Sequence, residues 1–305
     1  MAALDEALAE PLVAREETPL RRFITEFAAS KLAIAGLAVF IIVAFVAIFA
    51  SWIAPTDPYD LSKLDILDGR QPPGAESMDG HVFWLGSDDQ GRDMVSAIMY
   101  GLRTSLGVGA MSAVLALLIG GAIGLLAAYF GGKADTIVMR IVDIQLSFPS
   151  ILVALILLAV LGQGVGKIIF ALVTVQWAYY ARTVRGSALV ERRKEYIEAA
   201  RCLALGHNHI VFRHLLPNCL PPLIVVVTVQ VAHAISLEAT LSFLGIGLPI
   251  TEPSLGLLIA NGFDHMMSGK YWISFFPGVA LLIAIVSINL VGDRLRDVLN
   301  PRYQK

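Results

Sequence analysis

The chain has 305 residues, of which 56% are hydrophobic and only 16% are charged, and its formal net charge at pH 7 is −2. The apolar residues fall in long blocks instead of the short spacings of a water-soluble core, so the composition indicates a membrane protein. The charge is slightly negative and basic residues form no stripe, so we expect no nucleic-acid partner. Two cysteines, Cys202 and Cys219, are too few for a disulfide framework.

Six apolar stretches qualify as candidate membrane spans, because crossing about 30 Å of hydrocarbon takes about 20 residues at about 1.5 Å each. They are Leu32 to Ala54, Thr104 to Phe130, Ile137 to Leu161, Ile168 to Ala181, Leu220 to Leu248 and Trp272 to Gly292. The fourth is the weakest, because aromatic residues crowd its end. The sequence therefore predicts an all-α membrane protein with six transmembrane helices.

Basic residues near the spans predict orientation, because cationic loops resist translocation. Residues 1–31 carry four Lys and Arg, whereas 55–102 carries three beside nine Asp and Glu. Basic residues are again frequent in 185–217 and in 293–305. We therefore expect a cytoplasmic tail at 1–31, an uncleaved first span at 32–54, a periplasmic loop at 55–102 and a cytoplasmic tail at 293–305.

The sequence allows two alternative structures for each of two polar segments on the predicted outer side. The loop 55–102 is rich in Asp, Pro and Gly, which suits either an ordered cap or a flexible lid. The segment from Pro249 to Tyr271 contains three glycines and a further proline, which suits either a re-entrant loop or a short interfacial helix.

The predicted inner loop 185–217 reads as a helix, a turn and a second helix outside the bilayer. Strong helix formers run from Glu191 to Leu205, the pattern breaks at Gly206, and a second stretch from Ile210 to Leu216 is expected to stop at Pro217. Such a hairpin is either a solvated charged loop or a surface that receives a push from a soluble partner.

The order of residues in this loop resembles the EAA loop of ABC-importer permeases. Glu198-Ala199-Ala200 is followed by Ile210 and then by Leu216-Pro217-Asn218. The resemblance implies that small alanines let an ATPase approach closely, while the glutamate offers a charge-assisted bond. The family usually has glycine at the position of Ala204, and here Gly206 follows two residues later, so docking is expected to survive with a shifted bend between the two helices. The residues that the resemblance implicates in ATPase coupling are Tyr196, Glu198, Ala199, Ala200, Arg201, Ala204, Gly206, Arg213 and Pro217.

Four further matches resemble permeases of the dipeptide and oligopeptide (DppC and OppC) type. They lie at 84–93 with 100–106, at 139–143 with 148–149, at 241–247 and at 289–297. The resemblance implies a type I ABC-importer permease fold with a five-span core at 103–292, both termini cytoplasmic, in a bacterial inner membrane. It also implies a homologous permease as heterodimer partner, two ABC ATPase subunits, a periplasmic peptide-binding protein and contact with membrane lipid.

The same resemblance implies a non-catalytic subunit that works by alternating access and binds no cofactor, with ATP and Mg held by the partner ATPases. Dipeptides or oligopeptides are the expected cargo. Glutathione, a nickel chelate or an opine-like compound is the alternative cargo, and an ion-coupled secondary transporter or channel is the alternative machine.

Two motifs that resemble ligand-binding sites do not match the patterns of such sites. The run Gly162 to Ile168 lacks the first glycine and the final Ser or Thr of a phosphate-binding loop. The thiol and imidazole groups of the inner loop match no standard zinc spacing, so we expect no metal site; they belong to Cys202, His207, His209 and His214.

Polar and small residues within the spans yield further candidates. Gln230, His233 and Glu238 are candidates for the translocation pathway, with Glu238 placed to meet a peptide ammonium group or, alternatively, to bond a neighbouring helix. Arg140 and Asp143 are expected to pair with each other or with a neighbouring helix. Small residues and prolines are expected to allow close packing and kinks, respectively; they are Gly120, Gly124, Pro149, Pro221 and Pro222.

Overall fold

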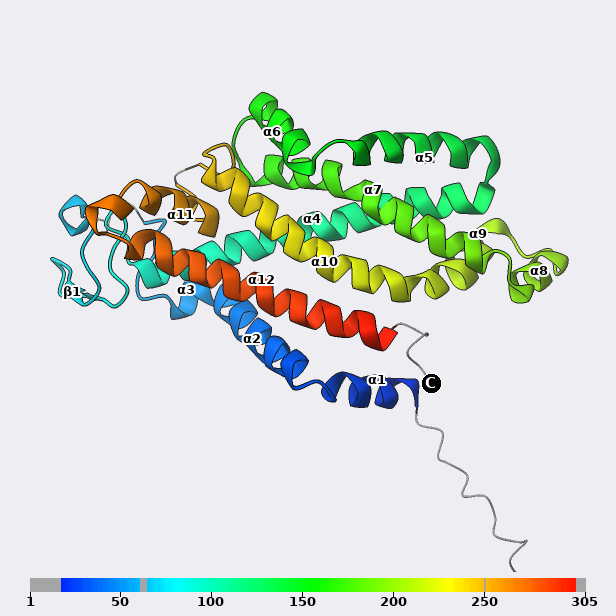
Figure 1. Cartoon of the computed structure of the whole chain (residues 1–305), viewed down its shortest axis with the longest axis horizontal. Helices are drawn as coiled ribbons and strands as arrows, with labels where there is room; N and C mark the ends of the chain where they lie inside the picture. The colour runs from blue at the N-terminus through cyan, green and yellow to red at the C-terminus, as the bar shows by residue number, and fades with distance from the viewer. Residues whose placement is uncertain (1–17, 61–64, 250, 300–305) are drawn as a thin grey trace, which may run out of the picture.

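The computed structural model describes residues 18–60, 65–249 and 251–299, and they form an elongated bundle of helices (Figure 1). The helices are α1 (Pro19–Ala28), α2 (Lys31–Ile48), α3 (Ala50–Ile53), α4 (Met94–Phe130), α5 (Gly132–Ser147), α6 (Ser150–Leu161), α7 (Val165–Glu191), α8 (Glu195–Cys202), α9 (His207–His209), α10 (Leu216–Phe243), α11 (Leu255–Phe263) and α12 (Trp272–Leu299). The shorter elements are the 3-10 turns η3 (Ile66–Asp68) and η5 (Met266–Ser268), the π-helical turn η4 (Ile210–Leu215) and the antiparallel strands β1 (Ala75–Glu76) and β2 (Val82–Phe83).

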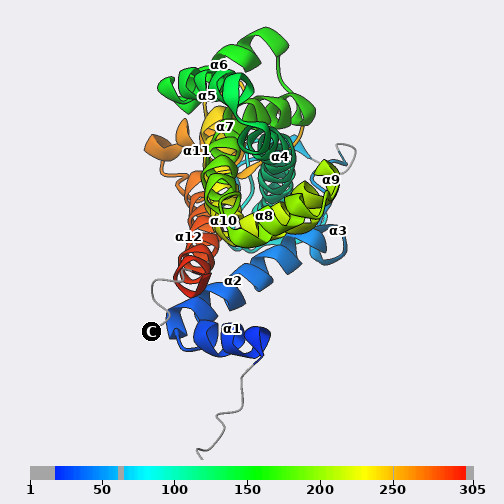
Figure 2. The ribbon, with the colours of Figure 1, turned by 90° about the vertical axis from the view of Figure 1, so that its right-hand side faces the viewer.

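The centre of the bundle is the close pair α4 and α7, which α10 joins. α5 and α6 lie on one side of these helices, and α12, α2 and α1 lie on the other (Figure 1, Figure 2). A Cβ atom at Gly120 would lie 2.1 Å from the carbonyl oxygen of Trp177, and one at Gly124 would lie 2.2 Å from that of Ala181. Since real Cβ atoms do not approach so closely, only glycine lets α4 and α7 touch here. The predicted packing role of the two glycines is confirmed.

Among the described residues, four helices are long and apolar enough to cross a membrane: α2, α4, the continuous helix His207–Phe243 and α12. α5 and α6 together pass the same test but are bent by 90°. The break lies at Phe148 and Pro149, where the predicted kink is confirmed.

α7 contains the predicted fourth span, Ile168 to Ala181, but is not among these apolar helices. Its middle is buried against other helices, with Ile168, Leu172 and Ala178 all fully enclosed. A helix that packs against other helices along much of its surface needs less lipid-facing apolar surface, and α7 keeps only part of its own exposed, as at Phe170 and Tyr179. The count of six spans therefore stays a prediction.

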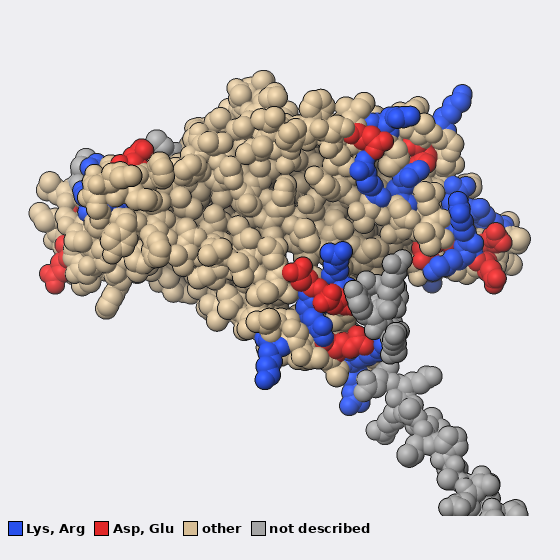
Figure 3. Space-filling model, in the orientation of Figure 1, with Lys and Arg blue, Asp and Glu red and all other residues tan. Residues whose placement is uncertain are grey.

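A broad part of the surface carries no charged side chain. Figure 3 shows this band on one face, with Lys, Arg, Asp and Glu gathered at the two ends and along the lower edge, where α1 lies in Figure 1. A band of this kind is the surface that hydrocarbon tolerates, since a charge at mid-bilayer costs at least about 2.5 kcal/mol.

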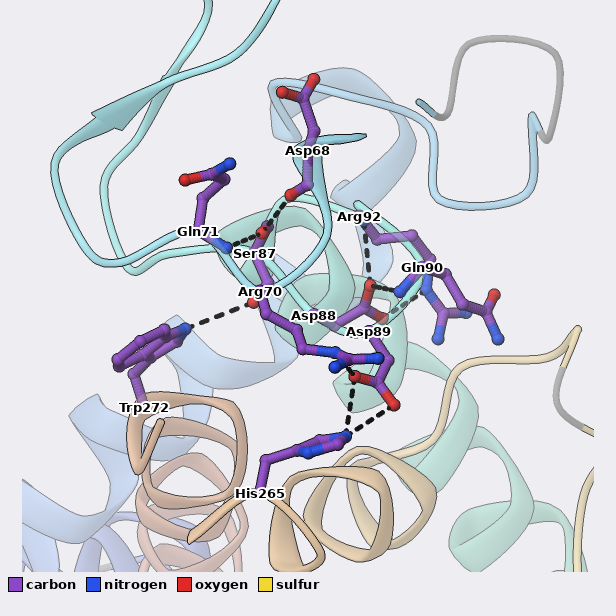
Figure 4. Close-up of polar contacts among 10 residues, drawn as sticks. All are labelled: Asp68, Arg70, Gln71, Ser87, Asp88, Asp89, Gln90, Arg92, His265 and Trp272. Atoms are coloured by element: carbon purple, nitrogen blue, oxygen red, sulfur yellow. Dashed lines mark hydrogen bonds and ion pairs between the residues drawn. The ribbon is translucent and has the colours of Figure 1, made fainter. Parts of the chain in front are cut away.

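One end of the molecule is a folded cap, which we define as residues 65–93 and 254–271 (Figure 1). Within it Arg92 donates to Asp88 over 2.6 Å, and both side chains are buried. Asp89 contacts Arg70 at 2.5 Å and His265 at 2.9 Å, which joins the two parts of the cap (Figure 4). The outer loop was expected to be either an ordered cap or a flexible lid, and its described part is an ordered cap. The segment after α10 contains the short helix α11.

Candidate functional site

The 185–217 loop forms a helical hairpin at the end of the molecule opposite the cap (Figure 1). α7 continues to Glu191, and α8 begins after a tight turn at Glu195. The chain turns back over 203–206 and becomes helical again at His207. The first predicted helix, Glu191 to Leu205, is thus two pieces: the end of α7 and the shorter α8.

Pro217 does not end the second helix of the loop, so that prediction was wrong. The chain stays helical from His207 to Phe243, with Pro217 in the first turn of α10. The turn before it, η4, has π-helical bonding. Proline lacks an N–H group, and it is tolerated where the ordinary bonding pattern is already interrupted.

Ala200 faces the interior of the chain, which corrects the expectation that its side chain meets a partner. It is 4% exposed and packs in one cluster with Ile197, Tyr129 and Leu215. Residues three apart lie on one face of a helix, so the burial of Ile197 brings Ala200 inside with it. Ala200 therefore attaches α8 to the bundle.

The opposite face of α8 is open. Glu198, Ala199 and Arg201 are exposed, as is Cys202. Leu203, which follows the helix, is 74% exposed. This face combines a carboxylate, a small residue and a projecting apolar side chain, which suits contact with another protein.

The bend after α8 lies at Ala204 and not at Gly206. Ala204 has φ of 53°, in the left-handed region where glycine is favoured. The N–H groups of Ala204 and Leu205 donate to the carbonyl oxygens of Arg201 and Ala200, at 2.9 and 3.1 Å. These two bonds make a Schellman turn. Gly206 has φ of −60°, which any residue adopts.

Glu191 ties the start of α8 to the end of α7. Its carboxylate accepts from Lys194 at 2.6 Å and from the hydroxyl of Tyr196 at 2.7 Å. Burial works against ionisation of Glu191, but these hydrogen bonds outweigh it and hold its pKa below the ordinary value. Burial and the same bond raise the pKa of Tyr196 to about 12, so its hydroxyl remains a donor at neutral pH.

Further contacts join the hairpin to the end of α4. The hydroxyl of Tyr129 lies 2.7 Å from Nδ1 of His207, and Arg192 donates to the carbonyl oxygen of Ala128 at 2.9 Å. The guanidinium of Arg201 lies 6.0 Å from the ring centre of Tyr129. Sequence reasoning missed Tyr129 and Arg192, because neither belongs to a motif and their partners are distant in the chain. Arg213 and Pro217, two other predicted coupling residues, are exposed.

Glu238 is enclosed between helices. It is fully buried, and its carboxylate oxygens accept from the hydroxyls of Ser105 on α4 and Ser242 on α10, both at 2.8 Å. The structure thus contains the helix-to-helix bond and not the open cavity wall that was the first expectation. A carboxylate and two facing hydroxyls satisfy one another in an apolar interior, which explains the arrangement.

Two of the other polar positions of the spans also bond between helices. The carbonyl oxygen of Gln230 accepts from Gln176 on α7 at 3.0 Å, and His233 is half-buried nearby on α10. Asp143 pairs with Arg182 on α7 and not with Arg140. Of the two pairings predicted for Asp143, the one with a neighbouring helix is confirmed.

Two family models match this chain. Residues 120–305 match the binding-protein-dependent transport system inner membrane component, and residues 18–73 match the N-terminal TM domain of oligopeptide transport permease C.

Individual proteins are similar over almost the whole length. The dipeptide transport system permease protein DppC of Escherichia coli (strain K12) is 40% identical, over 94% of this chain and 95% of the relative. The di/tripeptide transport system permease protein DppC of Pseudomonas aeruginosa is 36% identical, over 94% and 93%. Among solved structures, a chain of the inward-facing MetNI methionine ABC transporter matches with a TM-score of 0.55 at 23% identity, over 68% of this chain and 98% of that chain.

The similarity to the MetNI chain shows that the two chains share the fold of the helical core. The family match covers more than half of the chain and agrees with its apolar helices and with the ordered hairpin between α7 and α10. The chain therefore belongs to the binding-protein-dependent transport system inner membrane components, the multi-pass permease subunits of ABC importers.

Proposed function

We propose that this chain is one permease of a dipeptide or oligopeptide importer. In this proposal it pairs with a homologous permease, and a periplasmic binding protein delivers peptide from outside. Two ATPase subunits, which hold ATP and Mg, dock on the cytoplasmic 185–217 loops. The named relatives and the matched N-terminal model of an oligopeptide permease support peptide as the cargo.

The observation that carries the proposal is the division of α8 into two faces. Its inner face, Ile197 and Ala200, packs in a cluster that also contains buried residues of α4, α7 and α10. Its outer face, with Glu198 and Ala199, is exposed. Because packed interiors resist continuous deformation, a push on the outer face is passed to three long helices together.

The transport step in this account is a change between two packings of the same helices. ATP-driven closure of the ATPases moves α8, and the spans then open the pathway to the other side. Each partner must bind one packing better than the other, since only differential affinity shifts the equilibrium. This chain forms and breaks no covalent bond.

Reconstitution tests the proposal. The complex purified from native membrane is placed in lipid vesicles with ATP enclosed on the ATPase side and the periplasmic binding protein added outside, and uptake of labelled dipeptides and tripeptides is measured. The proposal expects peptide uptake that stops without ATP. Uptake of glutathione, a nickel chelate or an opine-like compound in place of peptides would refute the assignment of peptides as the cargo. Uptake driven by an ion gradient in vesicles that contain this chain alone would refute the proposal that the chain works in an ATP-driven importer.

A further inference from the structure

A cavity of about 400 Å³ lies where the end of α3, the cap and the start of α4 meet. Four aspartates are among the described residues that line it: Asp57, Asp68, Asp79 and Asp93. No lysine or arginine is among those lining residues. The cavity is therefore strongly acidic, and the cap residues that line it lie at the end of the molecule opposite the 185–217 loop (Figure 1).

Asp93 has a buried oxygen without a partner. The residue is 1% exposed, and its Oδ2 caps α4 by accepting from the backbone N–H and the hydroxyl of Ser96, at 2.8 and 2.7 Å. Its Oδ1 has no hydrogen-bond partner. A buried charged acceptor without a donor is destabilising, so this oxygen favours a ligand that donates a hydrogen bond to it.

The other carboxylates around the cavity keep acceptor capacity. Asp68 accepts from the hydroxyl of Ser77 at 2.5 Å and from the backbone N–H of Met78 at 3.1 Å, and Asp57 accepts from the backbone N–H of Tyr59 at 2.9 Å. A carboxylate can accept about four hydrogen bonds, so neither is saturated by these contacts. Nε2 of His81, which also lines the cavity, is another buried atom without a partner.

We propose that this cavity binds a primary ammonium group. Such a group brings one positive charge and three N–H donors, which suits several carboxylates arranged around a space and the unpaired Oδ1 of Asp93. A metal ion fits less well, because the described residues contain no group of three His, Cys, Asp or Glu side chains placed to hold one. The volume is that of a small-molecule pocket and larger than a bare ion needs.

Two kinds of molecule can bring this ammonium group to the cavity: a free alkylamine, and a periplasmic protein through a lysine side chain. In either case the bound group joins the end of α3 and the cap to the first turn of α4. The inference rests on the geometry of the cavity and not on the proposed transport of peptides.

The test is calorimetric titration of the purified complex with 1,5-diaminopentane, in nanodiscs of uncharged phosphatidylcholine at low salt. We expect saturable binding to wild type, and about tenfold weaker binding for Asp93→Asn, because one charge-assisted contact is lost. Asparagine still caps the helix, so α4 is retained. Asp79→Asn, at an exposed position without a capping role, should also weaken binding and keeps the test valid if Asp93→Asn fails to fold.

Glu76→Gln is the matched control, because it removes a carboxylate from the same part of the cap without lining the cavity. Absence of saturable binding to wild type would overturn the proposal, as would equal affinity in wild type, Asp93→Asn and Asp79→Asn. Equal binding of Ca²⁺ or of uncharged 1-pentanol would also overturn it. Displacement of the diamine by the cognate binding protein would identify a lysine side chain as the source, and lack of displacement would identify a free amine.

Discussion

The backbone N–H of Leu205 donates to the carbonyl oxygen of Ala200 at 3.1 Å, and this bond closes α8. The closure requires the residue between them, Ala204, to adopt φ of 53°. An L-residue in this region is strained by about 1–2 kcal/mol, whereas glycine is not.

Ala204→Gly should therefore stabilise the hairpin by about 1 kcal/mol and slow trypsin cleavage after Arg201 about fivefold, because local opening becomes rarer. Gly206→Ala is the control, since its φ is −60° and no atom lies within 4 Å of the added Cβ. Faster cleavage of Ala204→Gly than of wild type would contradict the strain.

Gly124→Ala should separate α4 from α7. The added Cβ would lie 2.2 Å from the carbonyl oxygen of Ala181, and such overpacking typically destabilises by about 1–3 kcal/mol. Gly121→Ala adds the same methyl group where the nearest atoms are 3.9 Å away. The thermal midpoint in detergent should fall for Gly124→Ala only. Equal midpoints for the two variants would show that the contact is not tight.

Sequence patterns predicted those features whose cause is local. The spacing of Gly120 and Gly124 is enough to predict close helix contact, and Pro149 alone predicts the break between α5 and α6. The identity of the loop followed from the order Glu198-Ala199-Ala200.

Features that depend on partners distant in the chain were missed. Glu198-Ala199-Ala200 places an alanine on each side of α8, so the motif alone does not say which one is buried; the signal is Ile197, three residues before Ala200. The environment of Glu238 depends on Ser105, which is 133 positions away. No periodicity reports such a contact.

Lowering the pH should loosen the start of α8. Because the pKa of Glu191 is below its ordinary value, its ionised form adds stability at neutral pH, and this stability is lost as the pH falls through the lowered pKa. Tyr196→Phe removes one of the bonds that lower the pKa, so the loss should begin at a higher pH.

A dye on the exposed Cys202 can follow this change from about pH 7 to about pH 3, since Cys219 is buried and resists labelling. Superimposable titrations of wild type and Tyr196→Phe would contradict the role of the tyrosine.

Glu238→Ala should destabilise the contact between α4 and α10 by about 1–3 kcal/mol, because the hydroxyls of Ser105 and Ser242 lose their acceptor in a buried site. Its thermal midpoint should fall, whereas Ser236→Ala, at an exposed position on α10, should leave it unchanged. A normal midpoint with complete loss of peptide uptake would instead place Glu238 in the translocation pathway.

The central claim is that the outer face of α8 receives the ATPase, and Ala199→Arg tests it most directly. Ala199 is exposed, so the variant should fold, whereas Ala200→Arg would force a charge into the buried cluster and disrupt the hairpin itself. Ala134→Arg, at an exposed alanine at the start of α5, is the control. The measurement is ATPase recovered on a tagged permease at matched membrane expression. The account predicts that recovery falls severalfold for Ala199→Arg and is normal for Ala134→Arg; full recovery and full transport in Ala199→Arg would contradict it.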